Sequence, residues 1–146
     1  MPYQDSSAWF AWAVLSACFA ALTAIFAKVG LEGIDSDFAT LVRTVVILGV
    51  LAVFVVATGK WSSPFELRPK TVLFLVLSGL ATGASWVCYF RALKVGDAAK
   101  VAPIDKLSVV LVALFAVVFL GERPAPREWL GIGLIGVGVL VLAVRR

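Results

Sequence analysis

The chain has 146 residues, of which 62% are hydrophobic and only 15% are charged, and its mean hydropathy is +1.02. Since about a quarter of the residues of a soluble domain are charged, this composition excludes an ordinary soluble protein. The formal net charge of +4 comes from basic residues spread over short loops, which argues against a nucleic-acid partner. A spanning helix needs about 20 apolar residues, so the chain is predicted to be a membrane protein with five spans and no soluble domain.

Five apolar segments predict an all-α, polytopic transmembrane helix bundle that forms a single membrane domain over residues 1–146. We place the spanning helices at residues 8–27, 38–58, 71–93, 98–120 and 127–144. The polar lead that follows Met1 lacks the basic region of a cleavable signal peptide, so we expect the first segment to stay as a helix. The longest loop is predicted at residues 59–70, which include Pro64.

The residue types argue against catalysis and metal binding. Histidine is absent, which excludes histidine metal sites and histidine proton relays. Cys18 and Cys88 lie in apolar segments, where we expect buried free thiols rather than a disulfide or a metal pair. No nucleophile has a base within reach, so we expect neither an enzyme nor a bound cofactor.

The third segment carries a stripe of hydroxyl groups at helical spacing, formed by Ser78, Thr82, Ser85 and Tyr89. Gly79 and Gly83 lie next to this stripe, in line with Trp86. Two interpretations stay open. The hydroxyls can bond their own backbone while the glycines let a neighbouring helix pack closely. Alternatively, the stripe and the aromatic rings form the wall of a ligand cavity.

The fourth segment contains Pro103, Asp105 and Lys106 within its first two turns. Each ionised side chain near the centre of a spanning helix costs roughly 2.5 to 3.5 kcal/mol, so such residues need a partner or water. Pro103 also removes an amide donor and frees the carbonyl of Ala99. The segment therefore combines a disturbed backbone with two charges.

Arg43, in the second segment, enters the membrane from the same side as Asp105, and their depths differ by only about 3 Å at the rise of a helix. One interpretation is a permanent Arg43–Asp105 ion pair that fixes helix packing. The functional hypothesis is that Asp105 exchanges this partner for substrate or a proton, with Arg43 and Lys106 available to an anionic group. An Asp105→Asn variant with full transport and full pH dependence would contradict the functional hypothesis.

The fifth segment contains Gly131, Gly133 and Gly136 in the spacing of a dinucleotide-binding fingerprint. We reject that function because no strand precedes the glycines and the segment is continuously apolar. Gly131 and Gly138 are seven residues apart and share a helix face, which favours close helix packing. We predict a dimer interface at Gly131, Gly136 and Gly138.

The basic residues of the loops are divided almost evenly between the two sides of the membrane. This balance favours insertion in both orientations, whereas a weak bias toward one orientation is the alternative. A chain with an odd number of spans that inserts both ways can form an antiparallel dimer, which recreates the inverted repeats of many transporters.

The run from Tyr89 to Leu142 resembles the second part of an EamA repeat of the drug/metabolite transporter superfamily. Lys28 and Arg43 fit the first part, so the resemblance covers about residues 9–143. The features that match in the second part are Tyr89, Phe90, Ala92 and Leu93, then Pro103, the pair Gly121 and Glu122, and the glycines Gly131, Gly136 and Gly138.

Typical members of that superfamily carry two repeats of opposite orientation and move amino acids, other metabolites or drugs by alternating access. This chain has one repeat and is similar to a half-size member, so the resemblance implies a dimer like that of the dual-topology small multidrug resistance proteins. Those relatives couple protons through a glutamate in helix 1. The first helix here has no acidic residue, so that mechanism does not carry over, and Asp105 is the candidate substitute.

We therefore expect a secondary transporter of small amino acid-like or drug-like metabolites in a bacterial inner (plasma) membrane. It is expected to export by alternating access as an antiparallel homodimer or a paralogous heterodimer. The alternative is a non-transporting partner subunit of a heteromeric transporter or lipid-linked flippase. The expected substrate-binding residues, in a cavity between the first four helices of the two protomers, are Trp12, Arg43, Ser85, Trp86, Tyr89, Asp105 and Lys106.

Overall fold

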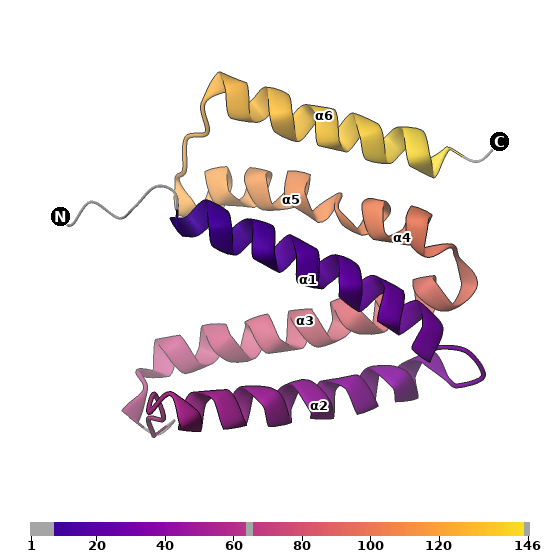
Figure 1. The fold of residues 1–146 in the computed structure, drawn as a ribbon. Coiled ribbons are helices and arrows are strands. Elements are labelled where there is room, and N and C mark those ends of the chain that lie inside the picture. The colour runs from indigo at the N-terminus through magenta and orange to yellow at the C-terminus, as the bar shows by residue number, and fades with distance from the viewer. Residues whose placement is uncertain (1–7, 64–65, 145–146) are drawn as a thin grey trace. The chain divides into compact units, whose positions relative to one another are not determined.

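The computed structural model describes residues 8–63 and 66–144, so the polar lead at Met1 and Pro64 of the long loop lie outside the described residues. The first three helices are α1 (Ala8–Gly30), α2 (Ser36–Ala57) and α3 (Pro69–Val95). They are followed by α4 (Ala98–Asp105), α5 (Ser108–Phe115), the π-helical turn η2 (Ala116–Leu120) and α6 (Pro126–Ala143), as Figure 1 shows.

Five stretches of these helices are long and apolar enough to cross a membrane, with α4, α5 and η2 together making the fourth. The predicted all-α fold with five spans is therefore confirmed. Most large apolar side chains are exposed on the surface of the chain, on every side of the helices. A helix that is apolar all round needs lipid or another protein around it, which agrees with a multi-pass membrane protein.

The free thiols of Cys18 and Cys88 are exposed on the chain, so the expectation that they are buried is wrong. The physical reason is that the surface of a spanning helix faces an apolar solvent, so an apolar side chain gains nothing by turning inward.

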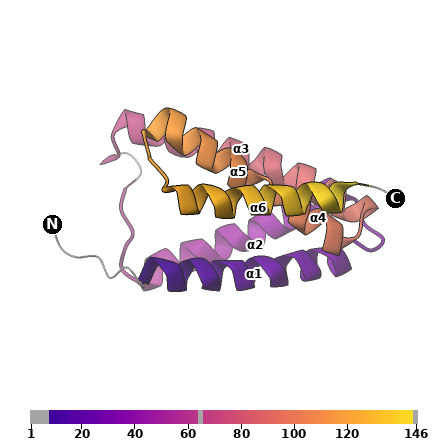
Figure 2. The same ribbon diagram turned by 90° about the horizontal axis from the view of Figure 1, so that it is seen from above.

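The helices pack as two compact units, which we describe separately. One unit holds Phe26–Val95, and the other holds the described residues before and after that range. In the first unit α2 and α3 lie side by side, as Figure 1 shows, and Figure 2 gives the view from above. Their contact is centred on buried Ala39 of α2 and on Phe90 and Leu93 of α3.

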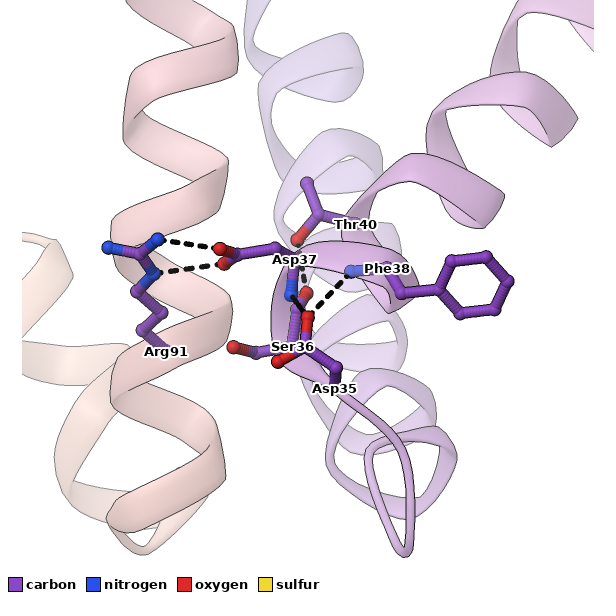
Figure 3. A network of polar contacts seen from close by, with 6 residues as sticks. All are labelled: Asp35, Ser36, Asp37, Phe38, Thr40 and Arg91. Carbon is purple, nitrogen blue, oxygen red and sulfur yellow. Dashed lines mark hydrogen bonds and ion pairs between the residues drawn. The ribbon is translucent and has the colours of Figure 1, made fainter.

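Helix α2 begins at Ser36, two residues earlier than the sequence analysis placed it, because Asp35 caps it. The Asp35 carboxylate accepts the amide hydrogens of Asp37 at 2.9 Å and Phe38 at 3.1 Å (Figure 3). The first amides of a helix lack partners within the helix, so a side-chain acceptor at this position satisfies them. Thr40 then donates its hydroxyl to the carbonyl of Ser36 at 2.8 Å.

In the other unit the fourth span is not the continuous helix expected from the sequence. It breaks after Asp105, where the amide of Lys106 bonds the carbonyl of Pro103 and the amide of Leu107 bonds that of Ile104, both at 3.0 Å. These bonds span three residues instead of four, so the helix tightens into a turn before α5 starts. Pro103 lies inside α4 and supplies no amide of its own, which weakens the helix at this point.

Helix α6 packs against both α4 and α5. A Cβ placed on Gly136 would lie 3.3 Å from Cγ2 of Val110 in α5, and Val139, one turn further on, is buried. A Cβ on Gly131 or Gly138 would meet nothing within 4 Å. Of the three glycines assigned to a dimer interface, Gly136 thus lies against its own chain, and that interface stays a prediction resting on the other two.

We expect Gly136→Leu to lower the free energy of unfolding by about 1–3 kcal/mol, because a larger side chain overpacks the contact with Val110. Gly133→Leu is the matched control, since a Cβ at Gly133 meets nothing within 4 Å. Thermal unfolding of both variants in detergent micelles measures the difference. Equal melting temperatures would contradict a close α5–α6 contact at Gly136.

Candidate functional site

The guanidinium of Arg43 on α2 lies over the aromatic rings of α3. Its central carbon is 4.2 Å from the ring centroid of Trp86 and 5.2 Å from that of Phe90. Arg43 and Trp86 are half-buried and Phe90 is buried, so the cation lies partly out of solvent. A cation over an aromatic face gains about 2 kcal/mol when it is desolvated. The two rings thus stabilise a charge inside a spanning helix.

No ion pair to Arg43 forms within the described part of its unit. The rings lie under the central carbon of the guanidinium, which carries its N–H groups at its edge. Those N–H groups form the rigid fork that binds a carboxylate or phosphate with two parallel hydrogen bonds. The arrangement leaves an oriented binding group for an anion within a span.

Helix geometry explains why α3 presents these rings together. Trp86 and Phe90 are four residues apart and Tyr89 lies between them, so all three project from one side of the helix. The sequence shows this alignment of aromatic residues. It does not show that α2 supplies the cation, and the contact of Arg43 with Trp86 was missed.

The hydroxyl stripe of α3 agrees in part with each of the two interpretations. The Thr82 hydroxyl donates to the carbonyl of Ser78 at 2.9 Å, as the backbone-bonding interpretation expects. Ser85 is exposed on the same stripe, next to Trp86. A Cβ on Gly79 or on Gly83 would meet nothing within 4 Å, so these glycines do not serve close packing within the chain.

A group of polar contacts fixes one end of this unit. Arg91 of α3 reaches Asp37 of α2 with two hydrogen bonds, from Nε to Oδ1 at 2.9 Å and from Nη2 to Oδ2 at 2.6 Å (Figure 3). Lys28 of α1 donates to the carbonyl of Leu93 at 2.7 Å, and Lys94 donates to the carbonyl of Ile34. Basic side chains of α3 therefore hold the first turn of α2 and the turn before it, and Lys28 ties α1 to α3. The sequence showed Arg91 and Lys94 only as part of a basic connection.

The remaining expected site residues belong to the other unit. The Lys106 ammonium lies 3.2 Å from Oδ2 of Asp105, and Trp12 of α1 is 72% exposed. This partner of Asp105 was missed, although it is the next residue in the sequence. The ion pair between Arg43 and Asp105 and a cavity that they share stay predictions, because the residues belong to different units. Among the described residues, no three His, Cys, Asp or Glu side chains are grouped so that they could hold a metal.

Comparison with known proteins supplies a family and two kinds of relative. The model of the EamA-like transporter family matches residues 7–144. A Sinorhizobium protein described as an uncharacterized transporter in the cobO 3′ region is 64% identical over 139 residues, which are 95% of this chain and 99% of the relative.

More distant relatives are described as probable 4-amino-4-deoxy-L-arabinose-phosphoundecaprenol flippase subunit ArnE. The one from Hamiltonella defensa is 27% identical over 86 residues, which are 59% of this chain and 76% of the relative. The one from Yersinia pestis is 29% identical over 84 residues, which are 57% of this chain and 74% of the relative. No solved structure matches the chain.

The contact between Arg43 and Trp86 can be measured by a double-mutant cycle with Arg43→Met and Trp86→Leu. We expect a coupling free energy of about 0.5–2 kcal/mol in thermal or denaturant unfolding in micelles, and Trp86→Phe should keep part of it. Trp61→Leu is the control, since Trp61 is 66% exposed and lies outside the spans. Additive effects of the two substitutions would show that the aromatic ring does not stabilise the cation.

Proposed function

The chain belongs to the EamA-like transporter family, and from this membership we propose that it is a secondary transporter of small metabolites that binds an anionic group of its substrate at Arg43. As a family member with five spanning helices it is a multi-pass integral membrane transporter, and its bacterial relatives point to the inner membrane. The substrate class, the direction and the mechanism are the proposal.

The anionic group of the substrate is inferred from one observation. Arg43 lies over Trp86 and forms no ion pair within the described part of its unit. A permanent structural arginine in a span is expected to have a carboxylate partner, because an unpaired charge there is expensive. Here the aromatic faces stabilise the charge, and in our proposal the N–H groups of Arg43 bind the anionic group of the substrate. Ser85 and Tyr89 lie nearby on α3 and can add hydroxyl contacts to a bound metabolite.

The other expected residues complete the proposal from their own unit. Trp12 offers an exposed aromatic surface, and Asp105 and Lys106 place both signs of charge within the fourth span. A substrate with both an anionic group and a cationic or aromatic part, such as an amino acid-like compound, suits these side chains. We assign Trp12, Arg43, Ser85, Trp86, Tyr89, Asp105 and Lys106 to substrate binding on this basis.

The working unit in this proposal is an antiparallel homodimer, or a heterodimer with a paralogue, that exports its substrate by alternating access. The family model matches the chain once, over residues 7–144, so one chain supplies one repeat. Five spans and an almost even charge balance let two copies of opposite orientation supply the inverted pair. The open faces of Gly131 and Gly138 on α6 suit the contact between them.

A second candidate is a partner subunit of a lipid-linked flippase. The observation that favours it is the similarity to the probable ArnE subunits, which are described as one part of a flippase for a phosphate-linked amino sugar lipid. In that case Arg43 would contact a phosphate, and the chain would need a second gene product for activity. Transport by the purified chain alone in proteoliposomes would contradict this candidate.

Export of anionic metabolites is expected to depend on Arg43. Cells that overproduce the chain should enrich the medium in at least one carboxylate- or phosphate-bearing metabolite, and Arg43→Gln should abolish that enrichment. Arg43→Lys should leave it reduced, because lysine keeps the charge but loses the fork and the stacking on Trp86. Mass spectrometry of the medium measures the effect. The control is Arg68→Gln, which removes an exposed arginine before α3, and unchanged enrichment with Arg43→Gln would contradict the proposal.

The antiparallel dimer predicts that the C-terminus is found on both sides of the membrane. One reporter fused after Arg146 that signals only inside the cell and another that signals only outside should both be active at the same expression level. If only one reporter signals, a self-complementing inverted pair is excluded, and an oppositely oriented partner protein becomes the expected second half.

A further inference from the structure

The break between α4 and α5 brings three features that favour a cation to one point of a spanning segment. They are a carboxylate, the carboxyl end of a short helix, and backbone carbonyls that have lost their helical donors. Each is seen in the described residues Ala98–Phe115.

The freed carbonyls follow from the bonds at the break. In a continuous helix the carbonyl of Ala102 would accept the amide of Lys106, but that amide bonds Pro103 instead. The carbonyl of Asp105 would accept the amide of Val109, but that amide bonds the carbonyl of Lys106 at 3.0 Å. Pro103 has no amide hydrogen, so the carbonyl of Ala99 also loses its partner. A carbonyl in a span that loses this donor can bind a cation or water in its place.

The Asp105 carboxylate stands at the last residue of α4, where the helix dipole is negative. A cation already contacts this carboxylate, since the Lys106 ammonium lies 3.2 Å from Oδ2 of Asp105. The side chain of Asp105 is 36% exposed and that of Lys106 is 55% exposed, so the pair is open on one side. An ammonium from outside or a metal ion can therefore reach the carboxylate.

No other described charge of this unit is placed to compete for Asp105. Lys100, one turn earlier in α4, pairs with Asp97 at 3.0 Å. Helix α6 packs against α4, and its described charges, Arg127 and Glu128, lie in its first turn, at the end next to η2 (Figure 1). The part of α1 in this unit has no charged residue from Ala8 to Ile25. Lys106 is therefore the cation that faces the carboxylate.

We propose that the break between α4 and α5 is a site for a monovalent cation, in which Asp105 and the freed carbonyls hold the ion and Lys106 occupies the site when the ion is absent. The inference deepens the proposed transport function, on which it rests, by naming the class of coupling ion. Discontinuous spanning helices with unwound carbonyls bind coupling ions in other transporters. The ion is either Na⁺ or an ammonium group, since both are monovalent and Lys106 already shows the fit of an ammonium.

In this site Lys106 acts as a tethered competitor. An external cation binds only to the fraction of molecules in which Lys106 has moved away, which weakens the apparent affinity. In either state the Asp105 carboxylate is paired with one monovalent cation. When the external ion binds, the Lys106 ammonium leaves the carboxylate and moves toward the open side. Occupation of the site is thus coupled to movement at the break.

The test measures binding of radioactive Na⁺ and, in a separate arm, of radiolabelled methylammonium to the purified full chain in detergent micelles. We expect saturable binding of at least one probe by the wild type. Asp105→Asn should abolish it, and Lys106→Gln should bind about tenfold more tightly because its competitor is gone. Lys100→Gln is the matched control, since it removes a lysine of α4 whose partner is Asp97, and it should bind as the wild type does.

The arms distinguish the ion, because a site for Na⁺ retains radioactive Na⁺ and a site for amines retains methylammonium. Absence of saturable binding of both probes to the wild type and to Lys106→Gln would overturn the inference, as would binding that survives Asp105→Asn. The gain expected for Lys106→Gln keeps the test decisive if Asp105→Asn fails to fold. Export that still depends on Arg43 in a chain that binds neither probe would overturn the cation site alone and leave the transport function intact.

Discussion

A charge inside a membrane-spanning helix must be compensated, and this requirement shapes both units of the chain. Arg43 is stabilised by the faces of Trp86 and Phe90, and no ion pair to it forms within the described part of its unit. Asp105 is compensated by the adjacent Lys106 at a break in the helix. Each solution lowers the cost of the charge without closing the group off. A structural protein has no need of such open groups, whereas a transporter needs polar groups that can change partners.

The rigid and the adaptable parts of the chain are separated along the helices. At one end of the first unit, the pair of Arg91 with Asp37 and the lysine bonds to Leu93 and Ile34 tie three helices and a capped turn together. The contacts lie at the ends of the spanning segments, where water keeps the one ion pair weak, so the ion pair and the two lysine hydrogen bonds stabilise this end together. The adaptable groups lie deeper in the spans. This arrangement suits the proposed alternating access, in which helices rock between two states while the contacts at one end are kept.

The membership in a transporter family bears on the apolar surface and the exposed glycines of the chain. The single repeat exposes apolar side chains on every side of its helices, and these can contact lipid or another protein. The open face of α6 at Gly131 and Gly138, and that of α3 at Gly79 and Gly83, are both wide enough for close approach of a second helix. In the proposed assembly, an oppositely oriented copy or partner supplies the second repeat.

The number and approximate ends of the spanning segments were determined by the sequence. Hydropathy over about 20 residues measures the transfer of a local segment into lipid and needs no knowledge of its neighbours. The family resemblance was also readable, and it agrees with the match over residues 7–144. Pro103 indicated a disturbed backbone in the fourth span, but the sequence did not show that the helix breaks after Asp105. Local chemistry was therefore predictable wherever the cause lies within a few residues.

Only the tertiary structure decided which side chains meet. The sequence did not show that Arg43 lies over Trp86 or that Gly136 lies against Val110, and both contacts were found only in the structure. The physical reason is that these helices are apolar all round, so no polar stripe in the sequence reveals how each is rotated about its axis. Packing between neighbours sets that rotation, and with it the partner of every charge, which is why the number of spans followed from composition while the site required coordinates.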